Sequence, residues 1–156
     1  MDKLLLAGVF KPYGVQNEWG EALCTMELLN NQVTREQGIH SPRSNNPSFG
    51  LYIMAENISV PTTVLDFPSW RKFTKEVRKG KYTHIGLSFI VPNVYKVRRM
   101  ANYVRGYSPD TKIILGGHGA GIPGLEKIVD YDDICRGEGI RWLRLYFGED
   151  PDKKIV

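Results

Sequence analysis

The sequence predicts an α/β protein with a doubly wound parallel sheet, and two observations carry that prediction. Short apolar runs typical of buried strands alternate with segments whose apolar residues recur at helical spacing. Five such runs occur, at residues 3–10, 61–67, 82–91, 111–116 and 132–136. Strands that alternate with helices pair in parallel, and right-handed crossovers limit their order. We expect a five-stranded, flavodoxin-like (Rossmann-type) sheet with the strand order 2-1-3-4-5.

The first strand, residues 3–10, is followed by a turn signal, Pro12-Tyr13-Gly14, and then by an unusually long connection. About fifty residues separate the first two strands, where a plain helical crossover needs about half that number. The pattern predicts an insertion over residues 15–48, with a helix at 18–31 and a loop at 38–48. A short buried helix is expected from Gly50 to Ile58.

The helix after the second strand has clear start and stop signals. Ser69 is a typical N-cap, and Gly80 a typical stop. The helical spacing between them predicts that Trp70, Phe73 and Val77 are buried.

The remaining helices are predicted in the same way. Asn93 is expected to cap the helix after the third strand, and a short helix is expected at 122–129. The last helix should run from Gly139 to Gly148 with three aromatic or apolar residues directed inward: Trp142, Leu145 and Tyr146.

Length and composition indicate one globular domain. The chain has 156 residues, of which 42% are hydrophobic and 24% charged. We assign residues 1–148 to the domain and 149–156 to the start of a linker.

No apolar run approaches the roughly 20 residues of a membrane span, and the run at 4–10 is too short for a signal core, so we expect a cytoplasmic protein. Cys24 and Cys135 form no metal-type cluster and imply no disulfide framework.

Positive charge is concentrated in one part of the chain. The net charge is +4, but Ser69 to Arg105 hold ten Lys or Arg and a single acid, Glu76. Such a run is typical of two helices with solvated outer faces. It is also compatible with a docking face for an acidic partner. Nucleic acid is not favoured, because aromatic and basic residues do not interleave as in known RNA-binding patterns.

Small residues end the third and fourth predicted strands. Ser88 ends the third and Gly116-Gly117 the fourth, with 25 residues between Ile90 and Gly116. The predicted strand order places both ends and the turn Pro12–Gly14 around one crevice at the carboxyl edge of the sheet. Ligands of open α/β sheets bind in such a crevice. Without a ligand, Ser88 would bond its own backbone and the glycines would form a tight turn.

An ordered set of short motifs spans most of the chain outside residues 15–48. The motifs are Lys3-Leu4-Leu5-Leu6, Phe49-Gly50-Leu51-Tyr52, Val64-Leu65-Asp66, His84-Ile85-Gly86-Leu87-Ser88-Phe89, Ile113-Ile114-Leu115-Gly116-Gly117 and Arg136-Gly137-Glu138-Gly139. With their spacings they resemble the N-terminal cobalamin-binding domain of cobalamin-dependent radical S-adenosylmethionine enzymes. The resemblance implies a cobalamin-binding module that serves a radical enzyme such as a methyltransferase.

In the family that the chain resembles, the corrin lies on the carboxyl edge and the nucleotide tail threads into the crevice. Gly116 and Gly117 match the glycines that make room for the flat heterocycle of the tail, and Ser88 matches the serine that hydrogen-bonds its ring nitrogen. Glu138 would contact the cofactor edge or cap the last helix. The cofactor-binding candidates are Tyr13, Gly14, Ser88, Ile90, Val91, Asn93, Gly116, Gly117, His118 and Glu138.

The chain departs from methyl-transferring domains of the methionine synthase type at the loop after the first strand. Those domains carry Asp-x-His-x-x-Gly, whose histidine ligates cobalt, whereas residues 10–17 contain no histidine. His84 should lie inside the third strand, far from the crevice, and His118 could reach only the tail. We therefore expect base-off cobalamin with no protein ligand to the metal.

The chain alone is not expected to catalyse a reaction. The iron-sulfur cluster and S-adenosylmethionine of the radical half need three closely spaced cysteines, which are absent from this sequence. The radical domain would be a partner, in the same or another chain.

Two other functions stay open. One is a Rossmann-like interaction module that has lost the cofactor and docks a substrate or an acidic partner through the basic helices. The other is a small nucleotide- or flavin-binding enzyme. Gly119-Ala120-Gly121-Ile122-Pro123-Gly124 satisfies G-x-G-x-x-G, but it follows the fourth strand, where a dinucleotide site would need it after the first.

Overall fold

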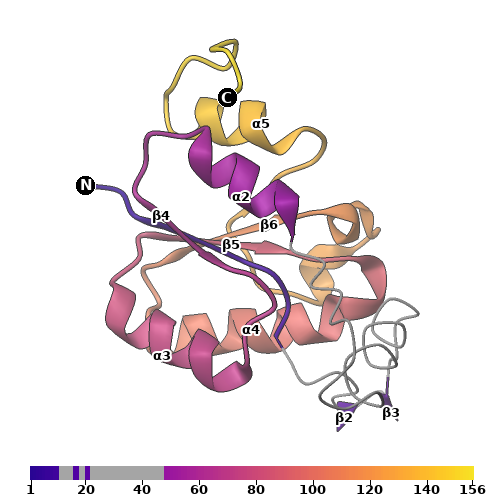
Figure 1. The fold of residues 1–156 in the computed structure, drawn as a ribbon. Helices are drawn as coiled ribbons and strands as arrows, with labels where there is room; N and C mark the ends of the chain where they lie inside the picture. Colours follow the sequence, from indigo (N-terminus) through magenta and orange to yellow (C-terminus); the bar gives the residue numbers. More distant parts are fainter. Residues whose placement is uncertain (11–15, 18–19, 22–47) are drawn as a thin grey trace, which may run out of the picture.

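A computed structural model describes residues 1–10, 16–17, 20–21 and 48–156. It contains a five-stranded, all-parallel sheet with the order β4-β1-β5-β6-β7, which confirms the predicted order 2-1-3-4-5 (Figure 1). The strands are β1 (Leu4–Ala7), β4 (Thr62–Leu65), β5 (His84–Ser88), β6 (Lys112–Gly116) and β7 (Asp133–Ile134). Each is shorter than its predicted run.

The insertion after β1 is described only in part. Gln16–Asn17 (β2) pairs antiparallel with Gly20–Glu21 (β3). Residues 20 and 21 therefore form a strand, and the helix predicted at 18–31 is wrong for these two residues. The rest of that helix, Tyr13, Gly14 and positions 38–47 of the predicted loop lie outside the described residues.

Helices cover both faces of the sheet (Figure 1). One face carries α2 (Phe49–Glu56) and α5 (Gly139–Tyr146), and the other carries α3 (Trp70–Gly80) and α4 (Val94–Tyr107). Two 3₁₀ turns, His118–Gly121 and Leu125–Lys127, follow β6, so the short helix predicted at 122–129 is reduced to the single turn Leu125–Lys127. Among the described residues, no helix combines the length and apolar character needed to cross a bilayer.

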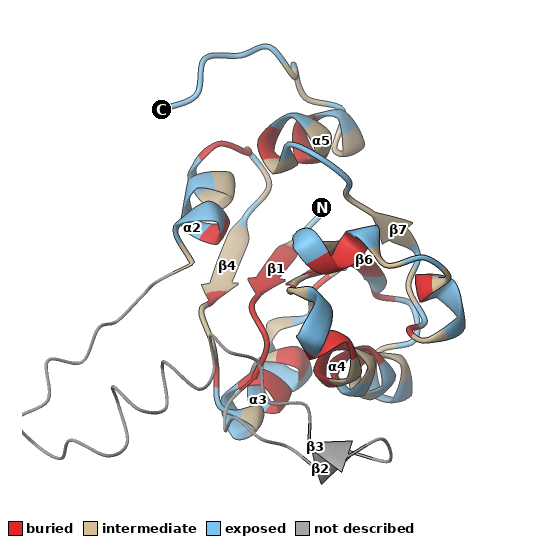
Figure 2. Ribbon diagram, turned by 90° about the vertical axis from the view of Figure 1, so that its right-hand side faces the viewer, coloured by how far each residue is buried: buried red, intermediate tan, exposed pale blue. Residues whose placement is uncertain are grey.

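The two faces of the sheet are packed to different extents (Figure 2). Successive side chains of a strand point to opposite faces, so Leu5 and Ala7 enter the core under α3 and α4, while Leu4 and Leu6 face α2 and α5. The α3/α4 core is extensive. The α2/α5 core has five fully buried members, Leu4, Leu6, Leu51, Ile58 and Leu143.

The two predicted N-caps behave differently. Ser69 Oγ accepts a hydrogen bond from the Lys72 N–H at 3.1 Å, which confirms the cap of α3. Asn93 holds the N-cap position of α4, but its side chain makes no capping bond, so that prediction is wrong in its chemistry. A 3₁₀ turn, Val91–Asn93, leads directly into α4, and the Asn93 and Val94 N–H groups bond the Ile90 and Val91 carbonyls within it.

The inward faces of α2 and α5 also differ from expectation. In α5 the buried residues are Ile140, Leu143 and Arg144, while Leu145 is 58% exposed and was wrongly placed in the core. The buried positions 140, 143 and 144 share one side of a helix, and each lies two residues before a predicted inward position. Trp142 and Tyr146 are only half-buried. A buried helix is predicted from Gly50 to Ile58, but among the residues of α2 only Leu51 is buried, and Tyr52 and Ile53 are each 45% exposed.

A buried arginine joins α5 to α2 and to the end of the chain. Arg144 is 2% exposed. Its Nε donates to the Asn57 carbonyl at 2.8 Å, and its other nitrogens donate to the Lys153 and Lys154 carbonyls. The Asn57 side chain in turn accepts from the Val156 N–H at 2.9 Å. Residues 153–156, predicted as the start of a linker, are thus held against the domain.

Replacing Arg144 with methionine should lower the free energy of unfolding by about 3 kcal/mol, because several buried carbonyl groups lose their donor. Urea denaturation measures the change. Arg141 on the same helix is the matched control: its side chain is 60% exposed and pairs with Asp152, so Arg141→Met should cost less than about 1 kcal/mol. Equal costs for the two variants would contradict a structural role for Arg144.

Candidate functional site

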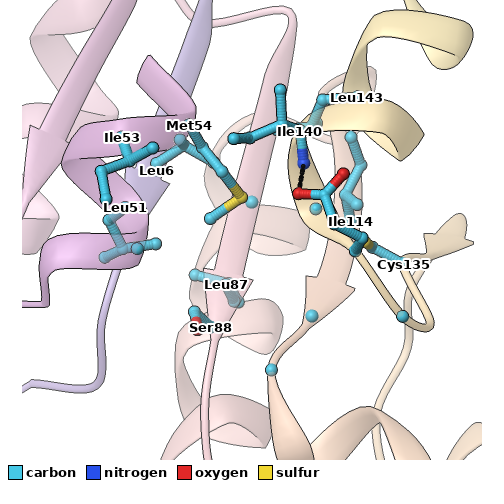
Figure 3. A pocket seen from close by; sticks show the side chains of 17 residues that line it. Leu6, Leu51, Ile53, Met54, Leu87, Ser88, Ile114, Cys135, Ile140 and Leu143 are labelled. Atoms are coloured by element: carbon cyan, nitrogen blue, oxygen red, sulfur yellow. Dashed lines mark hydrogen bonds between the residues drawn. The ribbon is translucent and has the colours of Figure 1, made fainter. Parts of the chain in front are cut away.

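A cavity of about 370 Å³ lies between the sheet, α2 and α5 (Figure 3). Its volume falls within the roughly 300–1,000 Å³ of small-molecule sites. Most of its wall is apolar. Seventeen residues line it: Leu6, Gly50, Leu51, Ile53, Met54, Gly86, Leu87, Ser88, Ile114, Gly116, Gly117, Cys135, Gly137, Glu138, Gly139, Ile140 and Leu143.

The alternation of β5 explains why the cavity opens on this face. Ile85, Leu87 and Phe89 belong to the filled core under α3 and α4. At the alternate positions, which face α2 and α5, the large His84 side chain at the amino end is followed by the small residues Gly86 and Ser88. The next strand repeats the step from Ile114 to Gly116, which is paired with Ser88. The face is therefore filled at the amino end of the strands and hollow at the carboxyl end.

His84 fills the amino end and is not a candidate ligand. The rings of Tyr146 and Phe147 meet its imidazole edge-on, with centroids 5.6 and 5.0 Å away. Its Nδ1 lies 2.8 Å from Thr83 Oγ1. Partial burial lowers the pKa of His84, with the nearby acids Asp2 and Asp133 acting against the shift. The neutral ring therefore packs as a core residue below α5.

The roof of the cavity depends on a close approach between the two helices. A Cβ on Gly139, the first residue of α5, would lie 2.4 Å from the Met54 sulfur of α2. The absence of that carbon lets Met54 extend across the cavity toward α5, as Figure 3 shows.

Gly116 and Gly117 lack side chains for different reasons. Gly117 has φ of +81°, and a Cβ there would lie 2.6 Å from the Phe89 carbonyl oxygen. The turn after β6 therefore requires glycine at 117. A Cβ on Gly116 would meet nothing closer than the Cys135 Cβ, at 3.8 Å. Packing against the described residues does not require glycine at 116, whose missing side chain adds to the cavity.

Ser88 supplies a hydroxyl to a wall that is otherwise apolar except for the Glu138 carboxylate and the Cys135 thiol. It lies at the end of the cavity away from Ile140 and Leu143 (Figure 3). Within the described part of the chain, its side chain makes no hydrogen bond to protein. The hydroxyl can therefore donate to, or accept from, a group that enters the cavity.

Glu138 lines the cavity and caps α5. Its carboxylate accepts hydrogen bonds from the Ile140 N–H at 2.8 Å and the Arg141 N–H at 2.7 Å. Burial, with a further contribution from the Glu138 charge, raises the pKa of the nearby Cys135 thiol. Cys135 is a free cysteine, and at neutral pH it stays protonated, since the thiolate is disfavoured in such surroundings.

Four of the ten predicted site residues meet at this cavity: Ser88, Gly116, Gly117 and Glu138. Four others lie elsewhere. Ile90 is half-buried, Val91 is 54% exposed, Asn93 is buried and His118 is exposed. Val91 and Asn93 belong to the turn before α4, and His118 opens the turn after Gly117; these two turns contact each other beyond the strand ends. Tyr13 and Gly14 lie outside the described residues.

The helical walls of the cavity are absent from the residues predicted from the sequence. Ile53 and Met54 of α2, Ile140 and Leu143 of α5, and Cys135 all line it. The signal was present in the strands, because Gly86, Ser88 and Gly116 lie on one face and leave a void that the covering helices must border.

The residues present fit a flat heterocycle better than a metal ion. The cavity offers mostly apolar walls, backbone at several glycines and the Glu138 carboxylate that caps α5. It also offers the Ser88 hydroxyl, which has no protein partner among the described residues. Over residues 1–10, 16–17, 20–21 and 48–156, no group of three or more His, Cys, Asp or Glu is placed to hold a metal ion. The nucleotide tail of a corrinoid, which needs an apolar slot and one hydrogen bond, is compatible with this donor set.

Comparisons with known proteins do not identify a family. No family model matches the chain, and a search of curated proteins also finds no match. The resemblance to cobalamin-binding domains stays a prediction from the residues.

The contrast between Gly116 and Gly117 can be tested by stability. Gly117→Ala should lower the free energy of unfolding by about 1–3 kcal/mol, because a side chain at positive φ is strained and the new methyl group meets the Phe89 backbone. Gly116→Ala should change it by less than about 1 kcal/mol, as substitutions without a clash usually do. Thermal unfolding of both variants provides the comparison. A larger loss at Gly116 would show that this glycine is required by the fold.

Proposed function

We propose that the chain is a cobalamin-binding module that holds the cofactor base-off by its nucleotide tail. The observation that carries this proposal is the cavity at the carboxyl end of β5 and β6, with Ser88 and Gly116 in its wall and no packing reason for glycine at 116. The parent would be a cytoplasmic radical S-adenosylmethionine enzyme such as a methyltransferase.

Each wall of the cavity would have a distinct role toward the tail. Leu6, Ile114 and Leu143 would exclude water from the faces of the heterocycle. Ser88 would hydrogen-bond the ring nitrogen that has left cobalt. Such a bond contributes about 1 kcal/mol net, and more is lost when a buried acceptor has no partner.

Cobalamin would supply the methyl-transfer chemistry at its cobalt, and the protein would supply position and surroundings. His84 is packed below α5, and His118 lies outside the cavity wall. No histidine of the described residues is therefore assigned to the metal. Radical chemistry requires a further domain that carries an iron-sulfur cluster.

Reconstitution with hydroxocobalamin tests the proposal. The protein should retain the corrinoid through desalting and show a base-off absorption spectrum. Gly116→Leu should abolish retention, because the new side chain occupies the cavity. Gly106→Leu is the matched control, since Gly106 lies on α4 with open space around its Cα. A tail site in this cavity would be contradicted if both variants lost the corrinoid, or if the wild-type protein did not retain it.

Ser88→Ala should weaken corrinoid binding by about fivefold, which corresponds to one hydrogen bond of about 1 kcal/mol. Equilibrium dialysis measures the affinity.

A second readout is alkylation of Cys135 at pH 8.5 in a Cys24→Ser background, which bound cobalamin should slow because Cys135 lines the cavity. Unchanged alkylation with retained corrinoid would place the cofactor elsewhere.

A further inference from the structure

The outer face of α3 is entirely cationic. Its exposed residues are Arg71, Lys72, Lys75, Arg78 and Lys79. Phe73, Thr74 and Val77 point inward and fix this orientation. The single acid of the helix, Glu76, accepts a hydrogen bond from the Tyr82 hydroxyl at 2.6 Å. We call these five cations the α3 basic face.

The α3 basic face does not stabilise its own helix. Lys75 has four like-charged neighbours three or four positions away, at 71, 72, 78 and 79, and like charges at these spacings repel. Arg71 and Lys72 also occupy the first turn, where the positive end of the helix dipole disfavours cations. Arg78 and Lys79, in the last turn, are favourably placed. Helix stability therefore does not account for the pattern.

Among the described residues, no ion pair neutralises this face. The ion pairs found among the described residues lie elsewhere, as in the pairing of Arg105 with Asp130 and Asp132. None of them involves a cation of the α3 basic face. The five cations, with Glu76 engaged by the Tyr82 hydroxyl, are therefore available to an external anion.

We propose that the α3 basic face docks an acidic protein surface. Charge complementarity identifies the partner as anionic. An acidic protein fits better than nucleic acid, because α3 exposes no aromatic side chain to stack on bases and no amide to read them. The helix has 11 residues and spans about 16 Å, which suits a compact acidic patch.

The position of α3 makes this surface independent of the cavity. The helix lies on the face of the sheet opposite α2 and α5 (Figure 1). A partner on α3 and a ligand in the cavity would therefore bind at the same time. This docking function does not depend on cobalamin binding.

Poly-L-glutamate provides a defined acidic probe, and oligouridylate a nucleic-acid probe of similar charge. Fluorescence anisotropy of labelled probes with the whole chain should show binding of polyglutamate that weakens as salt screens the charges. Polyglutamate should bind more tightly than oligouridylate. Tighter binding of oligouridylate, or no binding of polyglutamate, would overturn the proposal.

Lys75→Glu separates docking from folding. The substitution removes four repulsions, so the melting temperature should stay the same or rise, while polyglutamate affinity at low salt should fall about tenfold. Lys127→Glu, at an exposed position in the turn after β6, makes the same change of net charge and should leave affinity within about twofold. An equal loss in both variants would indicate a net-charge effect and overturn the assignment to α3.

Discussion

The architecture of the site depends on the absence of side chains on one face of two neighbouring strands. Gly116 leaves backbone where β6 would otherwise present a side chain, Gly86 makes room for the Leu6 side chain of β1, and Ser88 adds only a hydroxymethyl group at the end of β5. The covering helices α2 and α5 do not fill the resulting cavity. Met54 and Gly139 instead bring α2 and α5 together above it.

The opposite face shows what the same sheet does when the space is filled. Ile85, Leu87 and Phe89 pack into a continuous core that extends through α3 and α4. The Trp70 ring meets Phe10 edge-on at 4.8 Å and adds an aromatic layer at the end of β1. One strand therefore builds a rigid core with one set of alternate residues and a cavity with the other. This division allows a binding site without weakening the main core.

The strand order was predictable because it follows from general rules of parallel sheets and from runs of apolar residues in the sequence. The inward face of α5 was not, because apolar residues surround the helix: Leu143 and Leu145 are both candidates, and only contact with α2 decides between them. Ser88 and Gly116 could be placed at one edge from strand order alone. The helical walls could not, since the contacts of Ile53 and Met54 depend on where α2 settles. Arg144 bonds groups 87 positions away at Asn57, which no local pattern reveals.

The unequal filling of the two faces has a consequence for the response to hydrostatic pressure. Unfolding removes internal voids and lowers the volume of the system, so pressure favours states in which the voids have disappeared. In the part of the chain that the structure describes, the cavity lies on the side of α2 and α5. Compression should therefore loosen those two helices before it reaches the core under α3 and α4, in line with the regional differences in stability that proteins show. A molecule that occupied the cavity would remove that weakness.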